Sequence, residues 1–432
     1  MKYFLNRSLV LRSSFMLSLA LLAACDSVQP ELPAAPTTAY THSLSVDIDA
    51  SSRRADIEAR YGGDAIVWRP EAGFAVLGLG GEGALSTQSL EGAAVEPSQN
   101  EVVAPEAEVE TSRVWGGGDR AWSGGDRAWS GGIDIASEPA LSQKNADAWW
   151  QIDLENGFSL TPHRGSGIKV AVIDSGLDLD HPAFTNRLAP EGEWKDFVDG
   201  DAYPQEERSE GGDNSNYGHG TGVAGVVLQV APNATILPLR VLDAEGLGDI
   251  TDVAAAIDHA VAAGADVINL SLGTDEDSDA LNRMISYAAE HKVFVIASSG
   301  NTGDRRITYP ARNAKQSGRT GDYLLSVGSA KTYWGIMFVL SAFSTYGNTM
   351  EVIAPGEYIY TAFPGDQVGY WSGTSFSAPM VSGTLALLLG EDKEDEKTIA
   401  DRLDRLLSDV ELSYSPLNVR AFAEWAFGEA DD

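Results

Sequence analysis

Some residues of this chain have the types that serine-based attack on a carbonyl requires. A hydroxyl is the nucleophile, an imidazole takes its proton, a carboxylate orients that imidazole, and an amide donates to the oxyanion. The candidates for these four roles are Ser375, His219, Asp174 and Asn301. They follow one another along the chain as Asp, His, Asn and Ser, which is compatible with acyl-transfer chemistry.

The base and its orienting acid come from two distinct settings. Asp174 ends the apolar run "IKVAVID", where a buried strand tip can keep a carboxylate dry and hydrogen-bonded. His219 lies in "NYGHGTGVAG" at the mouth of a predicted helix. Of the six histidines only this one stands at the mouth of a predicted helix with glycines around it, and they leave its ring free to face a cleft.

The stretch "GYWSGTSFSAPMVSG" offers three serines as nucleophiles. Pro379 is tolerated only near a helix start, so a helix is expected to begin near Ser375, where free backbone N–H groups converge. Ser372 falls in a strand-like segment and Ser377 inside the first helical turn. Ser375 is therefore the predicted nucleophile. Asn301, after "VFVIASSG", is the predicted side-chain donor to the oxyanion.

The elements that must hold these residues form a regular series from about residue 136. Continuous apolar strands such as "IKVAVID", "ATILPLRVL", "ADVINLSL" and "VFVIASS" alternate with amphipathic helices. This alternation predicts an α/β fold with a mainly parallel sheet covered by helices on both faces. In such sheets, sites gather beyond the carboxyl ends of the strands, which is where the candidates stand.

Six motifs in order resemble those of the subtilisin-like serine proteases. They are "VAVIDSGLDLDHP", "GHGTGVAG", "DVINLSLG", "VFVIASSGNTG", "FSTYGNTMEVIAPG" and "SGTSFSAPMVSG", over roughly residues 145–392. The resemblance implies a three-layer subtilisin-like fold and a serine endopeptidase. It also implies a triad of Asp174, His219 and Ser375, with Asn301 and the Ser375 N–H as the oxyanion hole.

The same resemblance implies a substrate-binding segment and a primary pocket. Its first wall corresponds to Ser271, Leu272 and Gly273, and the opposite wall to Ala297, Ser298 and Ser299. None of these residues is charged or bulky, so medium or large apolar P1 side chains are expected. Ala183 stands where many relatives have a calcium-binding aspartate. No cofactor and no metal ligand is predicted, and calcium binding stays open without identifiable sites.

The amino-terminal region predicts export and lipid attachment. Residues 1–24 combine three basic residues with a short apolar stretch, as in a signal peptide. "LAAC" resembles a bacterial lipobox, which implies lipidation of Cys25 and a tether over 25–42. The expected location is the bacterial cell envelope, held by lipid. Asp26 resembles an inner-membrane retention signal in some bacteria, but which membrane carries the lipid stays open.

Three further segments complete the predicted organisation. Residues 43–80 form a small α+β unit that resembles the family's propeptides and implies a folding aid and inhibitor. Residues 81–135 have linker composition and include a seven-residue repeat with Trp115, Trp122 and Trp129. Residues 136–432 form the catalytic domain, which closes with two predicted helices after residue 392. The cut site is expected somewhere in 80–135.

The net charge of the chain limits the classes of molecule that it is expected to bind. Thirty basic and 63 acidic residues give a net charge of −33, which disfavours nucleic acid because its phosphates are repelled. The expected partners are protein or peptide substrates, the chain's own propeptide, and a membrane through the lipid anchor. The alternative function is a surface-binding lipoprotein that is catalytically silent or cuts only itself.

Overall fold

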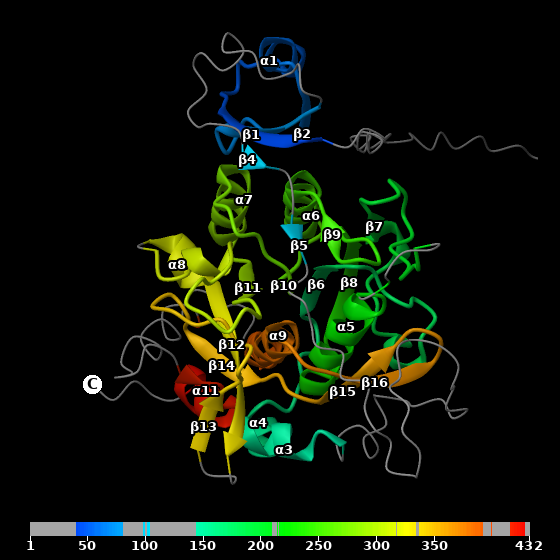
Figure 1. The fold of residues 1–432 in the computed structure, drawn as a ribbon, viewed down its shortest axis with the longest axis vertical. Coiled ribbons are helices and arrows are strands. Elements are labelled where there is room, and N and C mark those ends of the chain that lie inside the picture. Colours follow the sequence, from blue (N-terminus) through cyan, green and yellow to red (C-terminus); the bar gives the residue numbers. More distant parts are fainter. Residues whose placement is uncertain are drawn as a thin grey trace, which may run out of the picture. The chain divides into compact units, whose positions relative to one another are not determined.

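The computed structural model describes residues 40–80, 98–99, 102–103, 144–209, 214, 216–316, 318–333, 337–391, 399 and 415–427. Their largest element is a mainly parallel sheet (Figure 1). In lateral order its strands are β17 (Ser415–Pro416), β14 (Val352–Pro355), β12 (Leu324–Tyr333), β11 (Phe294–Ser298), β10 (Val267–Leu270), β6 (Lys169–Asp174), β8 (Thr235–Arg240) and β7 (Lys195–Asp196). Only β13 (Met337–Leu340), which pairs with β12, is antiparallel within it.

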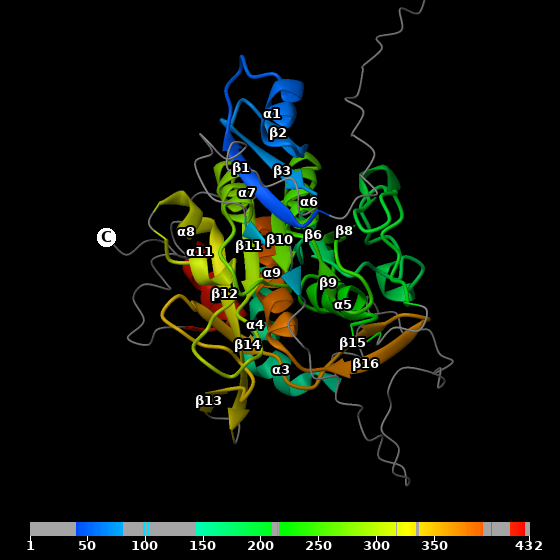
Figure 2. The same cartoon turned by 45° about the horizontal axis from the view of Figure 1, so that its top comes forward.

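Helices cover both faces of this sheet, as the apolar strands require. Side chains of β6 alternate between two cores: Val170 and Val172 belong to one, and Ala171 and Ile173 to the other. The first core includes α5 (His219–Val230) and α9 (Thr374–Glu391). The second includes α6 (Ile250–Ala262) and α7 (Asp279–Glu290). Figure 2 shows these helices around the strands, and the predicted α/β fold is confirmed.

The remaining elements close the edges of this domain. The helices are α3 (Ala146–Gln151), α4 (Leu154–Leu160), α8 (Arg319–Tyr323) and α11 (Val419–Phe427). A hairpin of β15 (Ile359–Phe363) and β16 (Gln367–Trp371) leads directly into the stretch that carries Ser375. The helix α11 corresponds to the second of the two helices predicted after residue 392. The charged helix predicted just after residue 392 falls almost entirely outside the described residues.

A small antiparallel unit precedes the catalytic domain. Its sheet has the order β2 (Asp64–Arg69), β3 (Phe74–Leu79), β1 (His42–Asp47) and β4 (Ser98–Gln99), and its helix is α1 (Arg54–Tyr61). The helix ends at Gly62, whose φ of 73° is left-handed and suits glycine. The unit has its own small core, which includes Leu44, Val46 and Leu77. Val67, Phe74 and Val76 instead pack with the core beneath α6 and α7.

The range assigned to a linker contains two short strands. β4 extends the small unit, and β5 (Val102–Val103) pairs with β9 (Leu247–Gly248) of the catalytic domain. Composition does not reveal such strands, because they exist only through pairing with distant segments. The predicted signal peptide, Cys25 and the tryptophan repeat lie outside the described residues. Among the residues that are described, no helix is long and apolar enough to cross a membrane.

Candidate active site

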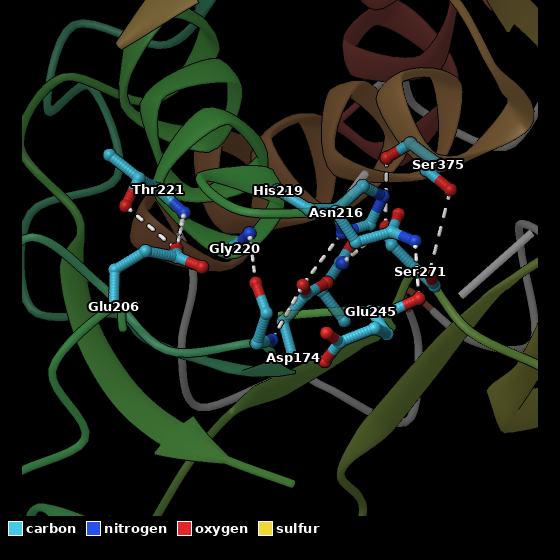
Figure 3. A network of polar contacts seen from close by, with 11 residues as sticks. Asp174, Glu206, Asn216, His219, Gly220, Thr221, Glu245, Ser271 and Ser375 are labelled. Atoms are coloured by element: carbon cyan, nitrogen blue, oxygen red, sulfur yellow. Dashed lines mark hydrogen bonds and ion pairs between the residues drawn. The ribbon is translucent and has the colours of Figure 1, made fainter. Parts of the chain in front are cut away.

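Asp174 lies at the carboxyl end of β6, where it meets His219. Its Oδ1 accepts hydrogen bonds from His219 Nδ1 at 2.6 Å and from the Ser175 amide at 2.8 Å (Figure 3). Both side chains are buried. Because an ionised carboxylate can only accept, Nδ1 carries the ring proton and Nε2 of the neutral ring is an acceptor. This is the tautomer that a general base needs.

The loop before α5 fixes where His219 begins the helix. The Asn216 carbonyl accepts from the His219 amide at 2.9 Å, and Asn216 Nδ2 donates to the Glu245 carbonyl at 2.9 Å. The next residue, Gly220, packs against the Asp174 loop. A Cβ there would lie 2.2 Å from the Gly176 carbonyl oxygen and 3.1 Å from Asp174 Cβ. Glycine is thus required for the imidazole to approach its carboxylate.

The imidazole is enclosed, yet its reactive nitrogen is unpaired. The rings of Trp371 and Phe376 lie with centroids 6.0 and 5.4 Å from the centroid of the His219 ring. Within the described part of the chain, His219 Nε2 has no hydrogen-bond partner. A buried polar atom without a partner is costly, about 1–3 kcal/mol. Nε2 is therefore available for a hydroxyl or a substrate at this position.

Electrostatics raise the pKa of His219 above its ordinary value near 6.5. Burial lowers this pKa, but the charge of Asp174 and its hydrogen bond raise it, and the charge of Glu206 raises it further. The net effect of the two carboxylates is to stabilise the protonated ring. An imidazole in this setting accepts a proton readily from a hydroxyl.

Ser375 stands in the first turn of α9, which begins one residue earlier at Thr374. Pro379 has no N–H to donate to the Ser375 carbonyl one turn back. Ser271 Oγ supplies that hydrogen bond instead, at 2.8 Å, and the Ser375 hydroxyl makes a long bond of 3.4 Å to the Ser271 carbonyl. The adjacent Phe376 ring, which packs on His219, brings the turn beside the imidazole.

The two neighbouring serines have structural partners. Ser377 Oγ is bonded to the Ala354 and Pro355 carbonyls, each at 3.1 Å. Ser372 Oγ accepts from the Tyr358 amide at 2.9 Å. Both hydroxyls have shorter bonds to backbone groups than the 3.4 Å bond of the Ser375 hydroxyl, and Ser375 adjoins the Phe376 ring that packs on His219, so the geometry favours Ser375 as the nucleophile.

Asn301 is oriented by Thr374, the residue next to Ser375. Its Oδ1 accepts from both the amide and the hydroxyl of Thr374, each at 2.9 Å. Because a backbone amide can only donate, the atom it meets is the amide oxygen of Asn301. The NH₂ group consequently points elsewhere as a donor. Thr374 was not singled out from the sequence, although it stands directly beside the predicted nucleophile.

The expected substrate-binding residues follow the ends of β10 and complete β11. Ser271, Leu272 and Gly273 are buried after β10, and Ala297 and Ser298 are the last residues of β11. Ser299 Oγ donates to the Thr345 carbonyl at 2.9 Å. A Cβ on Gly273 would lie only 2.6 Å from Thr308 Oγ1. The Thr308 side chain therefore packs directly against the first of these segments.

Two charged or polar residues near the site escaped the sequence reasoning. Asn216 and Glu206 lie in a polar loop region without periodicity, so no local pattern distinguishes them from solvent-exposed residues. Their partners, Glu245 and Thr221, come from other segments. Among the described residues, no group of three or more His, Cys, Asp or Glu side chains is arranged to hold a metal ion.

Comparison with known proteins agrees with this geometry. A family model described as the Subtilase family matches residues 165–409. Thermitase from Thermoactinomyces vulgaris is 36% identical over 239 residues, which cover 53% of this chain and 77% of thermitase. The thermophilic serine proteinase of Bacillus sp. (strain AK1) is 35% identical over 240 residues, and these cover 54% of that protein. Subtilisin BL from Lederbergia lenta is 34% identical over 233 residues, 77% of its length.

These matches span the strands and helices that carry Asp174, His219, Asn301 and Ser375. The family predicted from the six motifs is thereby confirmed. The chain belongs to the subtilase family of serine-type endopeptidases.

Proposed function

We propose that this chain cleaves peptide bonds through Asp174, His219 and Ser375, with Asn301 in the oxyanion hole. The observation that carries the proposal is the 2.6 Å bond from His219 Nδ1 to Asp174, which leaves the buried Nε2 without a partner beside the first turn of α9. In the proposed active conformation, the Ser375 side chain rotates away from the Ser271 carbonyl, and its hydroxyl bonds to Nε2. Catalytic hydrogen bonds are often long before substrate binds.

In this mechanism each proton has a defined place. Ser375 Oγ attacks the carbonyl carbon while its proton passes to His219 Nε2, and Asp174 stabilises the resulting imidazolium. The Ser375 amide and the Asn301 NH₂ group donate to the oxyanion. Collapse expels the amine, which takes the proton from Nε2. A water then hydrolyses the acyl-enzyme by the same route.

The proposed P1 preference is for apolar side chains. The walls formed by residues 271–273 and 297–299 carry no charge. We expect medium or large apolar P1 residues to be favoured over charged ones.

We also propose that the chain is made as a self-inhibited precursor. Arg69 of the small unit binds Asp258 of α6 through two hydrogen bonds of 2.7 and 2.8 Å, and its guanidinium lies 5.5 Å from the centroid of the Tyr287 ring of α7. A second ion pair joins Asp47 to Arg283 at 2.7 Å. These contacts support a unit that docks on the catalytic domain.

The position of strand β5 beside the proposed catalytic site also supports a self-inhibited precursor. It pairs antiparallel with β9, and the turn before β9 is bonded to Asn216, three residues before His219. An extended segment added to a strand edge is how many peptides bind. The chain's own residues 102–103 thus lie along the strand edge that adjoins the proposed catalytic site, where a substrate peptide would pair.

The test of the proposed function is covalent labelling of the full chain with a fluorophosphonate, which reacts with activated serines. We expect a single adduct on the peptide that carries Ser375, and no adduct in Ser375→Ala. A wild-type chain that stays unlabelled after its amino-terminal segment is removed would support the catalytically silent alternative.

We further propose that the chain is exported and carries lipid on Cys25. The mass of the mature amino-terminal peptide from the same preparation tests this.

Weakening the docking of the small unit is expected to release the site. Burial raises the pKa of Asp258 and the Arg69 charge opposes this, so Arg69→Ala leaves a half-buried carboxylate uncompensated. We expect the uncleaved precursor to be labelled about tenfold faster, which corresponds to about 1.4 kcal/mol. The control is Asp47→Ala, whose carboxylate is 69% exposed, and which should change the rate less than about threefold. Equal rates in all three chains would argue against inhibition by this unit.

A further inference from the structure

A second buried carboxylate supports the helix that carries His219. Glu206 Oε2 accepts hydrogen bonds from the Thr221 hydroxyl at 3.0 Å and from the Thr221 amide at 3.3 Å, in the first turn of α5 (Figure 3). Its own amide donates to the Leu177 carbonyl at 3.0 Å, in the loop that follows Asp174. Glu206 thus ties the first turn of the histidine helix to the loop of the aspartate.

A parallel connection runs through Ser175. Its Oγ accepts from the Gly220 amide at 2.9 Å, and its amide donates to Asp174 at 2.8 Å. Thr221 Oγ1, besides its bond to Glu206, accepts from the Asp178 amide at 2.9 Å. Of the two residues that follow His219, Gly220 is therefore held by Ser175, and Thr221 is held by both Asp178 and Glu206.

Glu206 also acts on the imidazole through its charge. Burial, with a smaller contribution from the Asp174 charge, raises the pKa of Glu206 to about 7, although hydrogen bonds from Gly218, Ser175 and Thr221 oppose the shift. The Glu206 charge in turn raises the pKa of His219. A carboxylate at this place stabilises the imidazolium that forms when Ser375 is deprotonated.

We propose that Glu206 is a positioning residue for the peptidase reaction. It holds the first turn of α5 so that His219 meets Asp174, and its charge stabilises the protonated imidazole. The inference rests on the proposed function. Glu206 itself does not contact the substrate or the reacting atoms. The other ionisable groups that interact with it electrostatically are Asp174, His219 and Tyr217.

The variant Glu206→Gln tests the effect of the Glu206 charge separately from that of its size and hydrogen bonding. Glutamine keeps the volume and an oxygen that can accept from Thr221, but it removes the charge. We expect kcat on a chromogenic peptide to fall about fivefold to tenfold with KM within about twofold, because the loss falls on the charged transition state. We also expect the acid limb of the kcat/KM–pH profile to move about half a pH unit lower, since His219 loses a stabilising anion.

Two further variants complete the set. Glu206→Ala also removes the acceptor for Thr221, and its kcat is expected to fall about thirtyfold. The matched control is Glu207→Gln at the adjacent position, an exposed glutamate whose carboxylate lies 3.5 Å from Arg240. This control should keep both the wild-type kcat and the wild-type pH profile. A merely structural role would lower the stability of Glu206→Ala and leave the Glu206→Gln profile where it was.

The pKa of His219, read by NMR of the ¹⁵N-histidine-labelled full chain in the Ser375→Ala background, gives a readout that does not need activity. Glu206→Gln should lower this pKa, and Glu207→Gln should not. If the His219 pKa and the kcat of Glu206→Gln both equal those of the wild type, the role of Glu206 is overturned. If the wild type neither hydrolyses peptides nor reacts with a fluorophosphonate while Glu206→Gln still lowers this pKa, the proposed function fails and the coupling stands.

Discussion

Replacing Ser375 by alanine is expected to lower kcat by about 10⁶-fold, the loss that removal of a triad serine causes in enzymes of this kind. The reason is that the neighbouring hydroxyls of Ser372 and Ser377 are bonded to backbone groups of other segments. Ser375 lies at the start of α9, where it shares two hydrogen bonds with Ser271, next to the unpaired Nε2 of His219. The measurement is hydrolysis of a peptide nitroanilide by the purified chain. If the precursor processes itself, the variant should also stay full length.

The neighbouring serines provide internal controls for this experiment. In Ser377→Ala the lost hydroxyl contacts only the Ala354 and Pro355 carbonyls among the bonds described, so stability should fall by about 1 kcal/mol and kcat by less than tenfold. Ser372→Ala loses an acceptor for Tyr358 and should behave similarly. If Ser375→Ala kept activity while one of these variants lost it, the nucleophile would have been assigned wrongly.

Replacing Asp174 by asparagine is expected to lower kcat by about 10⁴-fold with little effect on folding. The asparagine is nearly the same size, and its oxygen can still accept from Ser175. It lacks the charge that stabilises the imidazolium. In the other orientation of the amide, its NH₂ group takes the place of Oδ1 and faces the ring, so the ring proton moves to Nε2 and His219 can no longer act as the base.

Asp180→Asn is the matched control, because Asp180 lies in the same loop but is exposed. It should change kcat by less than about twofold. The assay is the same peptide hydrolysis, followed from pH 6 to pH 10, with the thermal midpoint measured for each variant. An Asp174→Asn chain within about tenfold of the wild-type kcat would show that His219 is oriented by some other group.

The sequence by itself determined the main architecture and the candidates for catalysis. Apolar strands alternating with amphipathic helices are local patterns, and they required a sheet buried on both faces. Because strand ends converge at one edge of a parallel sheet, the residues after "IKVAVI" and "VFVIASSG" were expected near one another. The glycines around His219 and the proline after Ser375 are also local signals. The expected helix start was correct within one residue.

Only the tertiary structure decided what holds those candidates in place. Thr374 orients Asn301 across 73 residues, and Ser271 replaces the hydrogen bond that Pro379 cannot make, across 104. Glu206 and the strand β5 acquire their positions through partners in other segments. A polar residue in a loop has no periodicity that reveals its partner. Such contacts arise when the chain closes on itself, and a one-dimensional pattern does not encode which distant donor meets which acceptor.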